Sequence, residues 1–257
     1  MKAEPITSPG PPWRFPPETL LLGCDEVHVW RATLDQPPSQ ILKFLNNLAV
    51  DEQARAERLR FKRDGEHFIV ARGVLRAILG FYSNRAPECV SFCYSSFGKP
   101  ALAGESDRDA IRFNVSHSHG VALYAVTRGR EVGIDLERIR FDLAVLEIAE
   151  RFFSRRELAM LRALPTELQR EAFYRCWTRK EAYIKARGEG LSLPLDQFEV
   201  SLAPGEPAAV LGTQHDPSEA SRWSLRELTP APGYFAALAV EGHDWGLTCW
   251  QWPDPRL

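Results

Sequence analysis

Three carboxylates have the residue types and the spacing to hold a hard divalent cation. In the run 132–137, Val-Gly-Ile-Asp-Leu-Glu, apolar residues alternate with Asp135 and Glu137, which predicts a strand with one apolar face and one acidic face. Two acids at positions i and i+2 of a strand stand roughly 6–7 Å apart, so side chains that lean together can share one ion.

The third carboxylate, Glu181, lies in a long predicted helix that ends near Gly188. Glu181 follows Trp177 of the apolar face by four residues, and Lys185 follows by four more, so both fall on or beside the face turned inward. An inward carboxylate is costly unless a cation or a hydrogen-bond network pairs with it. Oxygen ligands without histidine or cysteine favour Mg2+, with Mn2+ as a substitute, and Mg2+ held by few carboxylates also accepts substrate phosphates.

A second group of residues could bind phosphate. Ser116 and His117 end a predicted strand, and Lys99 follows Gly98 in a Gly-Lys-Pro turn. Hydroxyls, backbone N–H groups and a protonated imidazole at such places bind anions. Basic residues also cluster further upstream, at Arg55, Arg58, Arg60, Lys62, Arg63, Arg72 and Arg76.

Each of these features alone has an ordinary structural explanation. A histidine such as His117 is most often a hydrogen-bonded structural residue, two acids on a strand are often a solvated face, and Lys180 and Lys185 would be helix-surface charges. The basic cluster is balanced by nearby acids and could be a solvated helix face. A Ser-His-Asp hydrolase is excluded, because the serine and histidine are adjacent and no G-x-S-x-G turn occurs.

The composition is that of an ordinary globular protein. The chain has 257 residues, 44% hydrophobic and 26% charged, with a formal net charge of -2, so neither nucleic acid nor a membrane is an expected partner. Five cysteines without C-x-x-C spacing predict reduced thiols and a cytoplasmic location. No apolar run could span a bilayer, and the proline-rich start lacks the layout of a signal peptide.

The predicted elements follow the order strand, helices, strands twice, which indicates an α+β fold of two similar halves packed together. We expect a proline-rich arm over residues 1–22, one half over 23–128 and the other over 129–257. Capping boxes at 154–157 and 166–169 predict two helix starts. Helices are expected over 39–48, 51–60, 65–82, 143–150, 154–164 and 166–187. Strands are expected over 27–31, 89–95, 111–115, 132–137, 198–202, 223–228, 234–240 and 247–252, with one more ending at 126.

Taken together and in order, these motifs resemble the Sfp-type 4′-phosphopantetheinyl transferases. The resemblance covers about residues 50–202 and is most specific in Gly-Ile-Asp-x-Glu followed by Trp-x-x-Lys-Glu-x-x-x-Lys. Its motifs are Phe-Gly-Lys-Pro at 97–100, Phe-Asn-Val-Ser-His-Ser at 113–118, Val-Gly-Ile-Asp-Leu-Glu at 132–137, Arg-Phe-Phe-Ser at 151–154, Trp-Thr-Arg-Lys-Glu-Ala-Tyr-Ile-Lys at 177–185 and Gly-Leu-Ser-Leu-Pro-Leu at 190–195.

The resemblance implies a fold and a reaction. The fold would be a pseudo-dimer of two α+β halves with coenzyme A in the cleft between them, which fits a monomer. The reaction would be Mg2+-dependent transfer of the 4′-phosphopantetheine group from coenzyme A to a serine of an apo acyl or peptidyl carrier protein, with release of adenosine 3′,5′-bisphosphate. Residues 139–160 are expected to dock the acidic carrier protein.

By position, the resemblance also implies roles for individual residues. The metal ligands would be Asp135, Glu137 and Glu181, and the catalytic residues would be Glu181 as general base, Lys185 and His117. The coenzyme A contacts would be Arg58, Arg72, Gly98, Lys99, Ser116, His117 and Lys185. Two alternatives stay open: a non-catalytic module that binds coenzyme A or a carrier protein, and a Mg2+-dependent phosphohydrolase.

Overall fold

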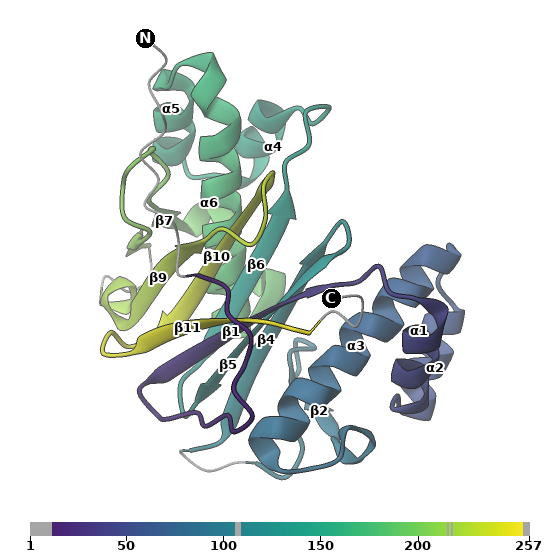
Figure 1. Cartoon of the computed structure of the whole chain (residues 1–257). Helices are drawn as coiled ribbons and strands as arrows, with labels where there is room; N and C mark the ends of the chain where they lie inside the picture. Colours follow the sequence, from purple (N-terminus) through teal and green to yellow (C-terminus); the bar gives the residue numbers. More distant parts are fainter. Residues whose placement is uncertain (1–11, 106–108, 215, 217, 254–257) are drawn as a thin grey trace.

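The structure is a computed structural model that describes residues 12–105, 109–214, 216 and 218–253 (Figure 1). The helices of this part are α1 (Pro38–Asn46), α2 (Val50–Glu57), α3 (Lys62–Ser83), α4 (Val145–Phe152), α5 (Arg155–Ala163) and α6 (Thr166–Arg187). Its strands are β1 (Glu26–Thr33), β2 (Phe92–Tyr94), β3 (Pro100–Leu102), β4 (Ile111–Ser118), β5 (Val121–Arg128), β6 (Val132–Arg138), β7 (Phe198–Val200), β8 (Val210–Thr213), β9 (Trp223–Leu228), β10 (Tyr234–Glu241) and β11 (Gly246–Gln251).

Two sheets form the centre of the molecule. The first has the order β11-β1-β5-β4 and the second the order β6-β10-β9. Strands β1 and β11 run parallel, whereas the other neighbours in both sheets are antiparallel. The last strand of the chain therefore completes the sheet that the first strand begins. In the proline-rich arm, Arg14 adds an isolated parallel bridge to Trp250, and residues 1–11 lie outside the described residues.

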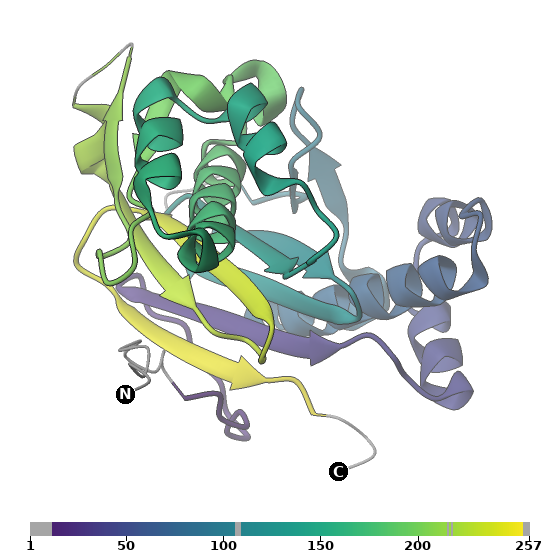
Figure 2. The same cartoon turned by 90° about the horizontal axis from the view of Figure 1, so that it is seen from above.

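The two sheets pack face to face, and each outer face is covered by a long helix (Figures 1 and 2). Alternation along the strands decides which core each side chain joins. Val27 and Val29 of β1 lie in the core between the sheets, whereas Trp30 and Ala32 lie in the core that contains α3. The third core joins α6 to the outer face of β9 and β10. The α+β class is thus confirmed, while the division into two similar halves at residue 128 stays a prediction.

The sequence located most of these elements to within a few residues, but it misassigned one helix start. The Ser154 capping box is confirmed, because Glu157 N–H donates to Ser154 Oγ at 3.1 Å and Ser154 N–H donates to Glu157 Oε2 at 2.8 Å. The box predicted at Thr166 is wrong. Pro165 already holds the N-cap position in an extended conformation, and no side chain caps it. Thr166 is therefore the first helical residue rather than the cap.

Two further differences concern short elements. The strand expected over 89–95 is reduced to the three residues of β2, and its first residue, Cys89, ends a 3-10 turn at Pro87–Cys89. The strands β3 and β8 were not predicted, because each has a single buried residue, Leu102 or Val210, which gives no alternation to detect. Among the described residues, no helix combines the length and the apolar character that a membrane span requires.

Helix α6 approaches β6 closely enough for their backbones to touch at Gly133. A Cβ atom at this position would lie 2.1 Å from the carbonyl oxygen of Ala182 and 2.3 Å from the amide nitrogen of Ala186. Real Cβ atoms do not come this close to backbone, so any larger residue must push the helix outward. Glycine at 133 therefore sets the distance between the helix and the acidic face of the strand.

We predict that Gly133→Ala lowers the free energy of unfolding by about 2–3 kcal/mol, or the Tm by roughly 5–10 °C, because the helix and strand must separate. Thermal and urea denaturation measure the effect. Gly212→Ala is the matched control, because a Cβ there meets nothing within 4 Å, and it should change stability by less than about 0.5 kcal/mol. Equal effects of the two substitutions would contradict the close approach.

Candidate active site

Asp135 and Glu137 lie on the face of β6 that points toward α6. The even-numbered residues Val132, Ile134 and Leu136 fill the core between the sheets, so the odd-numbered residues face the helix. Asp135 is 4% exposed and Glu137 is half-buried. The acidic face predicted from the sequence is therefore not a solvated surface, and its charge needs compensation from nearby groups.

The edges of the two sheets meet along β4 and β6. Three polar side chains of β4, Asn114, Ser116 and Ser118, accept hydrogen bonds from backbone N–H groups of β6, and we call them the β4 ladder. The donors are Ile134 N to Asn114 Oδ1 at 2.9 Å, Leu136 N to Ser116 Oγ at 3.2 Å and Arg138 N to Ser118 Oγ at 3.2 Å. Side chains thus replace the strand partner that the β6 edge lacks.

Ser116 also contacts the acidic face directly. Its hydroxyl donates to Asp135 Oδ1 at 3.0 Å and accepts from the Lys185 ammonium at 3.2 Å. The predicted contact of Ser116 with a coenzyme phosphate stays a prediction. Its only hydroxyl proton, however, is already donated to Asp135.

Glu181 and Lys185 reach the same place from α6. Lys185 Nζ lies 2.6 Å from Asp135 Oδ1, and both helix residues line a cavity of about 220 Å³. The spacing of four residues places them on one side of the helix, above the strand acids. The structure therefore brings together Ser116, Asp135, Glu181 and Lys185, which come from three separate segments of the sequence.

The carboxylates of this site have shifted pKa values. Burial raises the pKa of Glu181, and the negative charge of Asp135 adds to the rise while Lys185 opposes it. Burial also raises the pKa of Glu137, again with Asp135 adding to it and Ser118 and Lys185 opposing it. One ammonium group therefore does not balance the three carboxylates, and a further cation would relieve the remaining repulsion.

The donor set fits a hard divalent ion. Among the described residues, no group of three or more His, Cys, Asp or Glu side chains is already gathered as a metal site. One oxygen nevertheless lacks a partner, because Asp135 Oδ2 is buried and makes no hydrogen bond. Such an oxygen is costly unless it is paired, and carboxylate oxygens alone suit Mg2+. Asp135, Glu137 and Glu181 are therefore the candidate ligands, and their role as a metal site stays a prediction.

A larger cavity of about 610 Å³ opens beside the site, between the α2–α3 region and the end of β4. Arg55, His67 and His117 are among its lining residues. Burial of the His117 imidazole lowers its pKa, and the positive charge of Lys185 adds to this effect. The imidazole is therefore held toward its neutral form in the free protein. A bound phosphate would reverse the shift.

The basic residues of α2 and α3 differ in where they point. Arg72 lines a cavity of about 200 Å³ together with His117 and Arg55, and one of its guanidinium nitrogens, Nη1, is buried without a partner. Arg58 is exposed, donates to its own helix at Ala54 O, and lines none of these cavities. The structure therefore favours Arg55 over Arg58. The sequence could not separate them, because both lie in the same basic cluster.

Gly98 and Lys99 line the same cavity as Glu181 and Lys185. Gly98 has a φ of +81°, a conformation that glycine adopts without strain. The Lys99 ammonium already donates to Glu131 Oε2 and to Ala186 O, both at 2.8 Å. Lys99 therefore ties this turn to the C-terminus of α6, and its expected contact with coenzyme A stays a prediction.

Lys180, next to Glu181, was interpreted as a helix-surface charge, and this interpretation is wrong. Its side chain is 0% exposed and lies 2.8 Å from Glu157 Oε2. It also donates to the carbonyl oxygens of Leu195 at 2.7 Å and Phe198 at 2.5 Å. Because adjacent helical residues point about 100° apart, Lys180 anchors the back of α6 while Glu181 faces the site.

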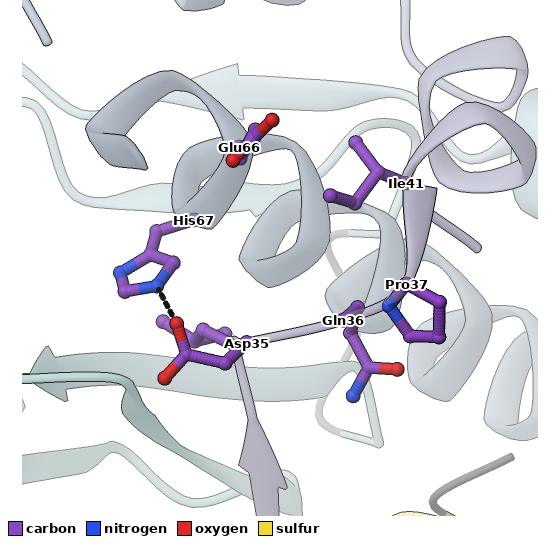
Figure 3. Close-up of a pocket in the computed structure, with 7 residues that line it drawn as sticks. Asp35, Gln36, Pro37, Ile41, Glu66 and His67 are labelled. Atoms are coloured by element: carbon purple, nitrogen blue, oxygen red, sulfur yellow. Dashed lines mark hydrogen bonds and ion pairs between the residues drawn. The ribbon is translucent and has the colours of Figure 1, made fainter. Parts of the chain in front are cut away.

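A further cavity of about 370 Å³ lies beside the large one and shares His67 with it (Figure 3). Asp35 and His67 point toward each other there, with His67 Nε2 2.9 Å from Asp35 Oδ1. This hydrogen bond lowers the pKa of Asp35, with the charges of His67 and Arg63 adding to the effect. The pair fixes the orientation of the His67 ring at the boundary between the cavities.

Two segments of the chain match models of known protein families. Residues 131–240 match the family described as the 4′-phosphopantetheinyl transferase superfamily, and residues 30–128 match the one described as 4′-phosphopantetheinyl transferase, N-terminal. The chain is 42% identical over 240 residues to 4′-phosphopantetheinyl transferase HetI of Nostoc sp. strain PCC 7120, which covers 93% of this chain and 98% of that protein.

One more distant relative agrees with this match. The chain is 29% identical over 221 residues to 4′-phosphopantetheinyl transferase Sfp of Bacillus subtilis strain 168, covering 85% of this chain and 94% of Sfp. Among solved structures, the holo-[acyl-carrier-protein] synthase of Thermotoga maritima superposes on 44% of this chain and 62% of its own, at 21% identity and a TM-score of 0.36.

We predict that Glu181→Gln stabilises the protein at neutral pH in EDTA. The pKa of Glu181 is raised in the folded state. Between about pH 4.5, the ordinary pKa of glutamate, and the raised pKa, the folded state therefore binds more protons than the unfolded state. Stability therefore falls as the pH rises through this window. Glutamine removes the buried charge, and its advantage should vanish below about pH 4.5.

The measurement is the Tm across this pH range, with and without Mg2+. Mg2+ should raise the Tm of the unmodified protein more than that of the variant. Glu171→Gln, an exposed position of the same helix, is the control and should show neither effect. A variant less stable than the unmodified protein at pH 7 in EDTA would show that the carboxylate is not strained by burial.

Proposed function

The chain belongs to the 4′-phosphopantetheinyl transferase superfamily and is a transferase of that family, and we propose that it uses Mg2+ to move the 4′-phosphopantetheine group of coenzyme A to a serine of an apo acyl or peptidyl carrier protein. The observation that supports the Mg2+ requirement is the buried, unpartnered Oδ2 of Asp135 beside Glu137 and Glu181. The donor and the acceptor follow from the family.

The transfer is a displacement at the β-phosphorus of coenzyme A. The carrier serine Oγ forms a new P–O bond, and the bond to the bridging oxygen of the pyrophosphate breaks. Adenosine 3′,5′-bisphosphate leaves with the electron pair of that bond, and the serine proton passes to a base. The protein must therefore neutralise a pyrophosphate, place the serine, and accept one proton.

Each need has a group in the candidate site. Mg2+ held by Asp135, Glu137 and Glu181 would neutralise the negative charge of the pyrophosphate. Lys185 binds the pyrophosphate and stabilises the leaving bisphosphate, and His117 adds positive charge once a phosphate raises its pKa. Glu181 accepts the serine proton, and burial raises its pKa in the metal-free protein.

Coenzyme A is long enough to need more than one cavity. Pro100 lines both the cavity with Arg55 and Arg72 and the cavity with Glu181 and Lys185, so a ligand can extend from the basic helices to the acidic site. We place the 3′-phosphate at Arg55 and Arg72, and the adenine near Gly98. Lys99 supports this turn through its bond to Ala186.

The carrier protein would approach at the segment 139–160, beside the end of β6. Phe141 is 82% exposed and Phe152 is 41% exposed, and Arg151 and Arg155 are exposed near them. Exposed aromatic and basic side chains suit an acidic partner helix. A monomeric state and a cytoplasmic location remain predictions from the sequence.

The test is incubation of an apo carrier protein with coenzyme A and Mg2+, followed by mass spectrometry of the carrier. We expect the carrier to gain the phosphopantetheine group. Coenzyme A consumed without a modified carrier would indicate the phosphohydrolase, and binding of coenzyme A without either change would indicate the non-catalytic module. Glu181→Gln should lower the rate of transfer by about 100-fold or more, because it removes the base. Transfer by this variant at the unmodified rate would exclude Glu181 as the base.

We also predict that Arg55→Ala raises the KM for coenzyme A by about tenfold or more, the effect of losing a charged contact to phosphate. Arg58→Ala, three residues later in the same segment, should leave this KM unchanged, because Arg58 lines none of the cavities described above. Steady-state kinetics at saturating carrier protein measures both variants. Equal KM values for the two variants would place the 3′-phosphate elsewhere.

A further inference from the structure

Ser118, which the sequence offered only as a second hydroxyl of the 113–118 motif, occupies a position equivalent to Ser116 one step along the β4 ladder. Ser116 donates to the carboxylate of Asp135, and Ser118 Oγ lies 3.2 Å from Glu137 Oε2 and donates to it. Each serine also accepts from the backbone N–H that follows its acid, at Leu136 or Arg138. The two serines thus repeat one hydrogen-bond pattern at a spacing of two residues on both strands.

The hydroxyl of Ser118 uses its full hydrogen-bonding capacity. A serine hydroxyl has one proton to donate and two lone pairs that accept. The proton goes to Glu137, one lone pair accepts from Arg138 N–H, and the other faces His119 Nδ1 at 3.1 Å. With the Ser118 proton donated to Glu137, the contact with His119 is made by the tautomer that carries its proton on Nδ1. Ser118 is 8% exposed, and water does not compete strongly for these bonds.

We infer that Ser118 is a positioning residue for metal binding: its hydroxyl, held by the backbone of β6, fixes the carboxylate of Glu137 in the orientation that the cation needs. The inference rests on the proposed function. Glutamate has three rotatable side-chain bonds and loses conformational entropy when it binds a metal. A hydrogen bond from a fixed donor restricts this freedom before the ion arrives, as donors to metal-binding carboxylates do.

Ser118 is a cleaner test of the ladder than Ser116. The Ser116 hydroxyl contacts Lys185, a residue placed in the catalytic machinery, so its loss would change several functions together. Among the contacts of Ser118, only Glu137 belongs to the candidate site. A change at Ser118 should therefore reach the metal ligands through that one carboxylate, and its effect on the cavity of about 610 Å³ that Ser118 lines with His117 is read separately from the KM for coenzyme A.

The experiment compares Ser118→Ala with Ser118→Thr, which keeps a hydroxyl and suits a strand. Mn2+ is the probe, and its binding is followed by electron paramagnetic resonance in the presence of coenzyme A without carrier protein. We expect Ser118→Ala to weaken Mn2+ binding by roughly tenfold or more and to raise the Mg2+ concentration needed for half-maximal transfer equally. The KM for carrier protein should stay unchanged, and Ser118→Thr should restore Mn2+ binding to within about twofold of the original.

A double-mutant cycle separates positioning from general damage. In a Glu137→Ala background, Ser118→Ala should weaken Mn2+ binding no further, because the carboxylate it orients is gone. Ser224→Ala is the matched structural control. Like Ser118, its hydroxyl bonds to a backbone group, here the carbonyl of Gly242, and contacts an imidazole, here that of His243. Ser224 lies on β9, at the edge of the second sheet away from β6. This control should leave Mn2+ binding unchanged.

The outcomes distinguish the two proposals. If the unmodified protein binds Mn2+ and transfers the group while Ser118→Ala binds Mn2+ equally well, the positioning role is overturned. It is also overturned if Ser118→Ala and Ser118→Thr lose affinity alike, or if Ser118→Ala still weakens Mn2+ binding in the Glu137→Ala background. If the unmodified protein neither binds Mn2+ nor transfers the group, the proposed function fails instead.

Discussion

The edge of β6 would be left with unpaired N–H groups if the polar side chains of β4 did not accept from them. Asn114, Ser116 and Ser118 accept from three alternate residues of that edge. A buried N–H without an acceptor costs about as much as a lost hydrogen bond, so the register between the two sheets is fixed by three bonds at once. A shift of one residue would turn Asp135 and Glu137 into the apolar core.

The same contact makes the site possible. Because β6 has no strand neighbour on the β4 side, its acids can be reached by side chains from the first sheet and by α6 together. Gly133 lets the helix approach to backbone contact, and Lys180 holds the other side of that helix through its buried pair with Glu157. Packing of the opposite side of α6 thus fixes Glu181 and Lys185 over the acidic face of β6.

This arrangement gathers negative charge that the protein alone does not neutralise. Glu137 and Glu181 both have raised pKa values, and the second oxygen of Asp135 lacks a partner. Sites of this kind lower stability in return for function. A divalent ion would neutralise the carboxylates. A substrate phosphate would pair with the basic groups, which are Lys185 and the arginines of α2 and α3.

The sequence by itself determined which candidate site residues share a face, and most of the fold. Alternation in 132–137 predicted that Asp135 and Glu137 share a face, helical spacing predicted that Glu181 and Lys185 do, and the motifs together identified the family. These are local patterns of period two or 3.6, which a single chain displays directly. The long helices and most strands followed from the same periodicities.

Only the tertiary structure decided which polar groups meet. It showed that Lys180 is buried whereas its neighbour Glu181 faces the site, that Lys99 is already paired, and that Arg55 rather than Arg58 reaches a cavity. It also joined Ser118 to Glu137 across the sheet edges. Partners so far apart in sequence are set by the packing of sheets and helices, and a residue type gives no sign of the partner it will have.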